Sequence, residues 1–234
     1  MTADSVIFLV DVDETLLHTD AFDRDLGDEL EGRFGAECRD RYRAIEKGLF
    51  AALGYRDYLE AFQRYRFENP EDQRLRSMSS YVLDYPFAKR LYPGALDVLR
   101  RLRGWGQTVI LTDGDIILQP RKVEQTGIAT AVDDHVLLYI HKEKNIPDIE
   151  RRYPAKHYVL VDDKLRILTA FKRAWSERVT TVFPRQGSYA NDPALLAKYP
   201  PADVTVEKIS HLLDFNLEGL LAAATGPPEL LTTA

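Results

Sequence analysis

The sequence has few of the features that define several protein classes. Cys38 is the only cysteine among 234 residues, so no disulfide can form within the chain and a fold held by disulfides is excluded. Positive charge is in the minority, because 31 Lys and Arg against 37 Asp and Glu give a net charge of −6. This balance argues against a nucleic acid or an anionic membrane as a partner.

Long apolar runs are also missing. The first residues, 1–5, have neither a basic region nor an apolar stretch, so we expect no signal peptide, no membrane span and a cytoplasmic protein. With 45% apolar and 29% charged residues, the composition is that of an ordinary globular protein. A chain of this length holds one large domain, or one domain with an insert.

Short apolar runs rich in β-branched residues predict buried strands. The first such run is residues 6–10, and helical patterns separate it from the later ones. This alternation predicts an α/β fold, with a Rossmann-like parallel sheet and helices on both faces. The later strands are expected at residues 108–112, 136–140, 157–161 and 179–182.

Residues 20–88 interrupt the alternation with helical patterns only. We expect the aromatic residues of this block to pack as core rather than to form a ligand site. The block is predicted to be a separate helical piece, while residues 1–19 and 89–226 form the α/β core. Residues 227–234 show no pairing pattern and are predicted to be a loosely ordered tail.

Two carboxylates, Asp11 and Asp13, follow the first strand directly. They stand at the carboxyl edge, where open α/β sheets bind their ligands. Such carboxylates are costly to bury unless a cation meets them. The string could also be a solvated surface turn. A calcium-binding EF-hand loop is excluded, because Leu16 and Phe22 stand where that loop needs Gly and Glu.

Polar side chains follow two further strands in the same way. Thr112 offers a hydroxyl that can donate a hydrogen bond to a phosphoryl oxygen, although Thr before Asp-Gly is also a common turn. Asp162 and Asp163 follow the strand at residues 157–161. Adjacent carboxylates repel each other unless a cation intervenes, and a hard divalent ion is the simplest one.

A lysine follows the strand at residues 136–140, and two positions qualify. Lys142 and Lys144 both lie just after it. Pro147 suits the first turn of the next helix, and Lys144 stands three residues before this proline. We therefore choose Lys144 and keep Lys142 as the alternative.

The segment Asp11-Val12-Asp13-Glu14-Thr15-Leu16 resembles the first motif of the haloacid dehalogenase-like (HAD) hydrolases. Thr112, Lys144 and the pair Asp162-Asp163 are similar to the second, third and fourth motifs, in the same order along the chain. The resemblance implies an HAD-like core, with the helical block as a cap that closes over the strand ends and selects the substrate.

The resemblance also implies a reaction, the hydrolysis of a small phosphorylated metabolite. Asp11 would attack phosphorus and form an aspartyl phosphate. Asp13 would protonate the leaving oxygen and then activate water. Thr112 and Lys144 would hold the phosphoryl oxygens.

Magnesium is the cofactor that the resemblance implies. Asp11, the backbone carbonyl of Asp13 and Asp162 would bind it. Asp163 would either ligate it through water or fix Lys144.

Several alternatives remain beside this phosphatase. Dehalogenating members of the family lack an acid in the place of Asp13, which disfavours that activity. A phosphotransferase or mutase and a catalytically silent HAD-fold binding protein stay open, as does the oligomeric state. A phospho-accepting receiver domain is disfavoured, since its paired acids come first and its lysine last. His18 and His141 lack the spacing of a transition-metal site, and a solvated loop position is the favoured reading of Arg185.

Overall fold

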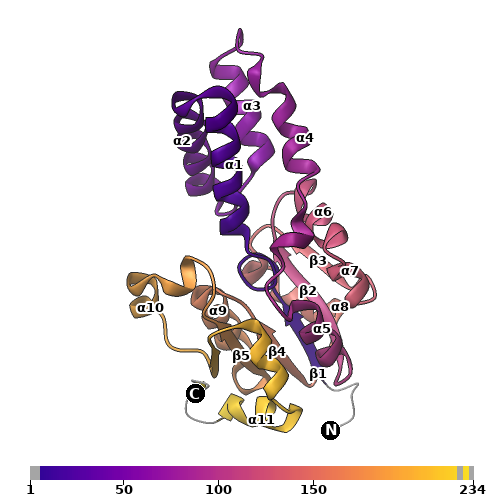
Figure 1. Ribbon diagram of the computed structural model, residues 1–234. Coiled ribbons are helices and arrows are strands. Elements are labelled where there is room, and N and C mark those ends of the chain that lie inside the picture. The colour runs from indigo at the N-terminus through magenta and orange to yellow at the C-terminus, as the bar shows by residue number, and fades with distance from the viewer. Residues whose placement is uncertain (1–5, 226–228, 232–234) are drawn as a thin grey trace.

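The structure is a computed structural model that describes residues 6–225 and 229–231. Its centre is a sheet of seven parallel strands in the order β3-β2-β1-β4-β5-β6-β7 (Figure 1). The predicted α/β fold with a Rossmann-like parallel sheet is confirmed. The strands are β1 (Val6–Val10), β2 (Gln107–Asp113), β3 (Val136–Tyr139), β4 (His157–Val161), β5 (Val179–Pro184), β6 (Val204–Val206) and β7 (Glu229–Leu231).

Both faces of the sheet are covered, as the apolar runs predict. Successive side chains of a strand point to opposite faces. On β1, Phe8 and Val10 belong to one apolar cluster, and Ile7 and Leu9 to the other. The first cluster includes side chains of α5 (Ala95–Arg103), α6 (Leu118–Gln125), α7 (Ile128–Ala131) and α11 (Leu217–Ala222). The second includes side chains of α8 (Ile146–Arg152) and α9 (Leu165–Trp175), while α10 (Pro193–Lys198) packs at its margin.

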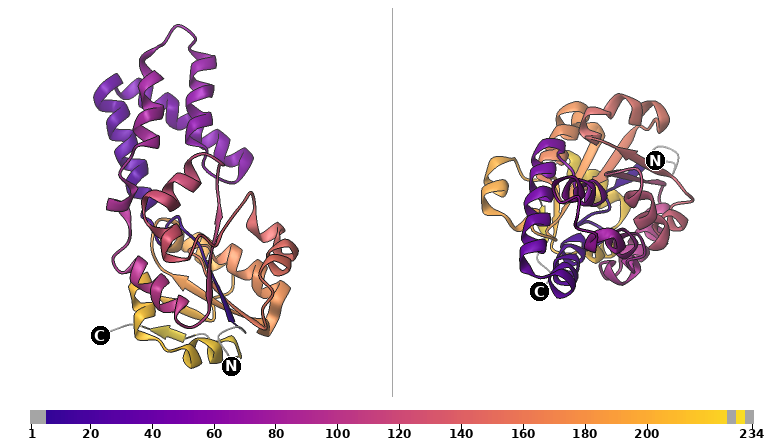
Figure 2. Two further views of the ribbon diagram at one scale, coloured as in Figure 1. Left: turned by 90° about the vertical axis from the view of Figure 1, so that its right-hand side faces the viewer. Right: turned by 90° about the horizontal axis from the view of Figure 1, so that it is seen from above.

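The helical block stands over one end of the sheet, as both views in Figure 2 show. Its α-helices are α1 (Thr19–Phe34), α2 (Ala36–Leu53), α3 (Tyr58–Glu68) and α4 (Met78–Leu83). Local signals set several of their ends. The carboxylate of Asp57 caps α3 by accepting the backbone N–H of Glu60 at 2.9 Å, and Gly54 ends α2 in the left-handed region at φ 80°. We call this block the cap.

The cap joins the sheet domain through two connections that run side by side. Leu17 and Leu91 form an antiparallel bridge, and the backbone N–H of Tyr92 donates to the carbonyl of Leu16 at 2.9 Å. The apolar interior of the cap is continuous with the first sheet cluster. Cap residues such as Phe22 and Tyr58 belong to the same buried cluster as Phe8 and Val10 of β1. Within the cap, Phe22 packs edge-on against Tyr58 with ring centroids 5.0 Å apart. The cap is therefore packed onto the core rather than tethered to it.

The predicted tail is described only in part. Residues Glu229–Leu231 form β7, which pairs in parallel with β6. The other residues of the predicted tail, 227–228 and 232–234, lie outside the described part of the chain. Within the described residues, no helix is long and apolar enough to cross a membrane.

Candidate active site

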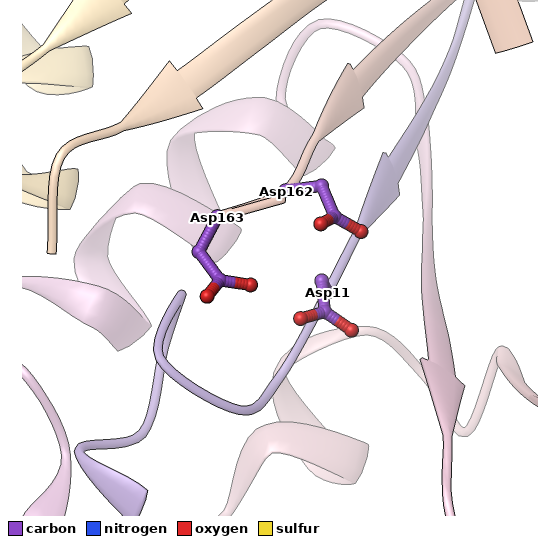
Figure 3. A group of neighbouring side chains, drawn as sticks. All are labelled: Asp11, Asp162 and Asp163. Atoms are coloured by element: carbon purple, nitrogen blue, oxygen red, sulfur yellow. The ribbon is translucent and has the colours of Figure 1, made fainter. Parts of the chain in front are cut away.

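Three carboxylates from two neighbouring strands meet at the carboxyl edge of the sheet. Asp11 follows β1, Asp162 and Asp163 follow β4, and the last residues of these strands, Val10 and Val161, are register partners. One oxygen from each carboxylate lies within 4.8 Å of the others. Figure 3 shows the three side chains pointing into one shared space. The expected convergence of these residues is thus present in the structure.

Burial makes this cluster electrostatically costly. Asp11, Asp162 and Asp163 are 3%, 0% and 1% exposed. Burial raises the pKa of Asp11 to about 6, with the attraction of Lys142 opposing the rise and the repulsion of Asp162 adding to it. Burial likewise raises the pKa of Asp163 well above its usual range, although Lys164 opposes the rise. The site therefore holds more negative charge than its protein partners neutralise.

The lysine that reaches the cluster is Lys142, not the expected Lys144. Its Nζ lies 2.6 Å from Asp11 Oδ1 and 2.6 Å from Asp162 Oδ2, and it donates to the carbonyl of Leu111 at 3.0 Å. Burial alone would lower the pKa of Lys142, but Asp11 and Asp162 raise it. Lys144 is exposed and lines the cavity between the cap and the strand ends, and it forms no ion pair within residues 6–225 and 229–231.

The connection after β3 explains why Lys142, rather than Lys144, reaches the cluster. The chain leaves this strand at Tyr139 and forms a short 3₁₀ turn over Lys142–Lys144 before α8 begins at Ile146. Lys142, the first residue of this turn, is held by its backbone N–H, which donates to Asp113 Oδ1 at 2.8 Å. The proline signal of α8 therefore marks the helix start correctly but does not identify the inward-facing lysine.

The carboxylate cluster fits a hard divalent cation. Asp11 Oδ2 and both oxygens of Asp163 are buried and have no hydrogen-bond partner in residues 6–225 and 229–231. Lys164 Nζ lies 3.8 Å from Asp163 Oδ1, beyond hydrogen-bond distance. Buried polar atoms are normally hydrogen-bonded, so these carboxylate oxygens in one hollow suit a further positive partner. Carboxylate and carbonyl oxygens are the ligands that Mg²⁺ prefers.

Asp13 lies on a tight turn that follows β1. The backbone N–H groups of Leu16 and Leu17 donate to the carbonyl of Val12 at 2.8 and 2.9 Å. Glu14 adopts the left-handed region at φ 59°, and its buried carboxylate accepts the hydroxyl of Tyr92 at 2.6 Å.

The Asp13 carboxylate is saturated with donors. Thr19 Oγ1 donates to Oδ1 at 2.5 Å, Gln119 Nε2 donates to Oδ2 at 3.1 Å, and Lys122 Nζ donates to both oxygens at 3.0 and 3.2 Å. Burial would raise the pKa of Asp13, but Lys122 and Thr19 together lower it. Asp13 is therefore held as the carboxylate.

Thr112 belongs to the same network. It ends the core of β2, is 1% exposed, and its hydroxyl accepts Gln119 Nε2 at 2.8 Å. The backbone then turns at Gly114, where an added Cβ would meet the Gln119 side chain at 3.0 Å. Thr112 thus stands near the end of its strand, and Gln119 links its hydroxyl to the Asp13 carboxylate.

A cavity of about 550 Å³ opens between the cap and the strand ends. Asp13, Lys122 and Asp163 line its inner end. The cap contributes Phe50, Tyr55, Arg56 and Tyr58, and the core contributes an apolar flank that includes Phe183, Leu196 and Tyr199. This volume lies in the range of small-molecule sites.

The side chains without a predicted role lie at the margin of this site. His18 Nδ1 lies 3.3 Å from Glu14 Oε2, and His141 lines the cavity, where an added Cβ on Gly54 of the cap would meet its ring at 2.6 Å. Arg185 Nη1 lies 3.3 Å from Glu207 Oε1, and this arginine is not among the cavity lining.

Two residues of the site are not predicted from the sequence. Gln119 and Lys122 stand three apart on α6, a spacing that puts both on one helical face. They are 2% and 3% exposed, unusually low for such side chains. Their spacing is visible in the sequence, but only the placement of α6 against Asp13 shows that the polar face turns inward.

Comparison with known proteins agrees with this geometry. The pattern of the haloacid dehalogenase-like hydrolases matches residues 7–179. A crystal structure from Burkholderia xenovorans LB400, assigned to the same hydrolase family, shares 52% sequence identity and a TM-score of 0.88, covering 92% of this chain and 98% of that one. The chain therefore belongs to the haloacid dehalogenase-like hydrolases.

More distant structures share the fold. Magnesium-bound YfnB from Bacillus subtilis is 16% identical with a TM-score of 0.61, over 90% of this chain and 97% of that one. L-2-haloacid dehalogenase from Xanthobacter autotrophicus is 15% identical with a TM-score of 0.57, over 91% and 97%. A search of curated proteins finds no significant sequence match. This protein is thus a hydrolase of the family with the HAD-like core and a helical cap.

Proposed function

We propose that the protein hydrolyses a small phosphate monoester in a magnesium-dependent reaction through an aspartyl phosphate on Asp11. The observation that carries the proposal is the pairing of two unlike carboxylates two residues apart. Asp11 stands in a cluster with unpaired oxygens, whereas Asp13 is held by three side chains. Asp11 is therefore suited to attack phosphorus and to bind a cation, and Asp13 to donate and accept a proton.

Asp11 supplies the nucleophile. Its Oδ2 is free of hydrogen bonds in the described structure, while Oδ1 is fixed by Lys142 at 2.6 Å. Attack by Oδ2 on phosphorus would form the aspartyl phosphate and release the alkoxide or alcohol of the ester. Lys142 replaces Lys144 in this proposal, as the cation that offsets charge on the phosphoryl oxygens.

Asp13 handles the proton in both halves of the reaction. The negative charge of the substrate would raise the pKa of Asp13 against the donors that lower it, and the proton that Asp13 then carries would pass to the leaving oxygen. The resulting carboxylate then takes a proton from the water that attacks the aspartyl phosphate. The donors around Asp13 suit this second form, since they stabilise the carboxylate.

Magnesium would be held by Asp11, Asp162, Asp163 and the backbone carbonyl of Asp13. When bound, it would neutralise charge on the nucleophile and the phosphoryl oxygens. The unpaired buried oxygens of Asp11 and Asp163 support this assignment.

Dehalogenation is the second candidate, because a solved neighbour is an L-2-haloacid dehalogenase. A halide leaves without a proton, so a dehalogenase has no use for the acid at Asp13. The donors that fix this carboxylate therefore favour the phosphatase. A phosphotransferase or mutase would use the same Asp11 chemistry with a second acceptor in the cavity.

One assay separates these activities. Purified protein is incubated with p-nitrophenyl phosphate or L-2-chloropropionate, each with magnesium or with EDTA, and phosphate and chloride release are measured. We expect phosphate release that depends on magnesium and is absent from Asp11→Asn. Chloride release without phosphate release would overturn the proposal in favour of a dehalogenase. No release of either would favour a silent binding protein.

A further inference from the structure

Lys122 of α6 is a buried cation to which the mechanism above gives no role beyond stabilising the Asp13 carboxylate. Its side chain is 3% exposed, and it approaches the site from the helix after β2 rather than from the turn that carries Lys142. Its Nζ donates to Asp13 Oδ1, Asp13 Oδ2 and Gln119 Oε1 at 3.0, 3.2 and 3.1 Å. These three contacts use all the donors of an ammonium group.

Gln119 completes the arrangement. Its amide nitrogen donates to Asp13 Oδ2 at 3.1 Å and to Thr112 Oγ1 at 2.8 Å, while its amide oxygen accepts from Lys122. The carboxylate of Asp13 is thereby tied to the end of β2 through one side chain. Both Gln119 and Lys122 line the cavity between cap and core.

Aromatic rings of two other segments cover Lys122. Its Nζ lies 5.8 Å from the ring centroid of Tyr58, which starts α3 of the cap, and 5.9 Å from that of Phe87. Both rings belong to fully buried side chains. A cation over aromatic faces is stabilised and has little contact with water, so the ammonium has few alternatives to its place beside Asp13.

We infer that Lys122 and Gln119 are positioning residues that hold the Asp13 carboxylate toward the leaving-group oxygen of the substrate. This inference rests on the proposed phosphatase activity. The competing account is that Lys122 only offsets a buried negative charge. That account predicts a general loss of stability or rate, whereas positioning predicts a loss that depends on how much the leaving group needs a proton.

The test uses kcat/KM for a series of phenyl phosphates that differ only in ring substituents. This quantity reports the steps up to departure of the phenol, before the aspartyl phosphate is hydrolysed. Phenol needs a proton as it leaves, whereas nitrophenolate leaves as a stable anion. Misplacing a catalytic group by about 1 Å can cost about 100-fold in rate.

We expect Lys122→Met to lower kcat/KM about 10- to 100-fold for phenyl phosphate and less than about 3-fold for p-nitrophenyl phosphate. Gln119→Leu should likewise lower kcat/KM more for phenyl phosphate than for p-nitrophenyl phosphate. Lys122→Arg keeps the charge and is the variant least expected to disturb folding. Arg121→Met is the matched control. Arg121 is the neighbour of Lys122 on α6 and donates to the cap carbonyl of Leu83 at 3.2 Å rather than to Asp13.

The outcomes distinguish the two proposals. Wild-type protein that hydrolyses none of the esters contradicts the phosphatase, and with it this inference. If the wild type is active but the Lys122 and Gln119 variants lose rate equally on every ester, or lose none, only the positioning role is overturned. If Arg121→Met also lowers kcat/KM more for phenyl phosphate than for p-nitrophenyl phosphate, the positioning role is overturned, because any change in α6 would then produce the effect.

Discussion

Asp11 and Asp13 are two residues apart, yet the protein treats their carboxylates in opposite ways. Asp11 lies with Asp162 and Asp163 in a buried cluster where Lys142 contacts Asp11 and Asp162, Lys164 Nζ lies 3.8 Å from Asp163 Oδ1, and several oxygens accept no hydrogen bond. Asp13 accepts hydrogen bonds from Thr19, Gln119 and Lys122. The pKa of Asp11 is raised and that of Asp13 is lowered.

This difference indicates which carboxylate is suited to bind a cation. Unpaired buried carboxylates cost free energy that a bound cation can recover. A saturated carboxylate gains little from a cation and is instead fixed in direction. We call the residues around Asp11, where negative charge is poorly neutralised, the electrostatic side of the site. We call the residues around Asp13, where hydrogen bonds fix the carboxylate, the geometric side.

The largest expected effect is on turnover. Asp11→Asn keeps the shape of the side chain but removes the nucleophile, so we expect phosphatase activity to fall by at least about 10⁴-fold. Circular dichroism should show an intact fold, which serves as the control. Retention of most of the rate would place the nucleophile elsewhere.

A comparison of two lysines tests the electrostatic side. Lys142→Met leaves buried carboxylates without their cation, and we expect it to destabilise the metal-free protein by about 3–5 kcal/mol. Lys144→Met removes an exposed cation and should change stability by less than about 0.5 kcal/mol. Urea unfolding at neutral pH measures both. Similar losses in the two variants would argue against the assignment of Lys142.

Stability should depend on pH through Asp11. The unfolded chain releases this proton near the ordinary pKa of 3.8, whereas the folded protein releases it at about 6. The folded state holds more protons between these values, so Asp11 makes the stability of the metal-free protein fall as pH rises from about 4 to 6. The raised pKa of Asp163 adds a fall in the same direction. The loss is on the order of 1–3 kcal/mol. Thermal unfolding across this range measures it, and a rise instead of a fall would contradict the burial of Asp11 as a poorly neutralised charge.

Neutralising Asp163 should make the metal-free protein more stable. Asp163→Asn removes a charge whose two oxygens lack hydrogen bonds in the described residues, and we expect the metal-free protein to gain about 1–2 kcal/mol at neutral pH. The same change should weaken magnesium-dependent stabilisation. If the variant is less stable than the wild type and still gains stability from magnesium, Asp163 is not part of the cation site.

The smallest effect is expected on the geometric side. Asp13→Asn keeps the backbone carbonyl, so magnesium should stabilise this variant to within about 0.5 kcal/mol of its effect on the wild type. Thermal unfolding with and without magnesium provides the measurement. A large loss of metal stabilisation would show that the Asp13 side chain itself contributes to the cation site.

Much of this arrangement is predictable because short apolar runs end where the chemistry begins. The runs before Asp11, Thr112 and Asp162 specify buried strands, and parallel strands bring their carboxyl ends to one edge. The positions of these residues therefore follow from the pattern of apolar residues alone.

The remaining details depend on geometry that this pattern does not encode. Lys142 faces the site because a 3₁₀ turn of three residues follows β3, and the direction of a side chain in such a turn has no periodic signal. Lys122 contributes only because α6 packs its polar face inward. The strand Glu229–Leu231 has only three residues, too few to show a strand pattern in the sequence.

The most direct test of the account is to find where the phosphoryl group goes. Wild-type protein is mixed with a phosphate ester and magnesium, quenched in acid during turnover, and mapped by tandem mass spectrometry. The account predicts a phosphoryl group on Asp11 that is absent in EDTA and in Asp11→Asn. Steady phosphate release with an unmodified Asp11, or with the phosphoryl group on another residue, would contradict it.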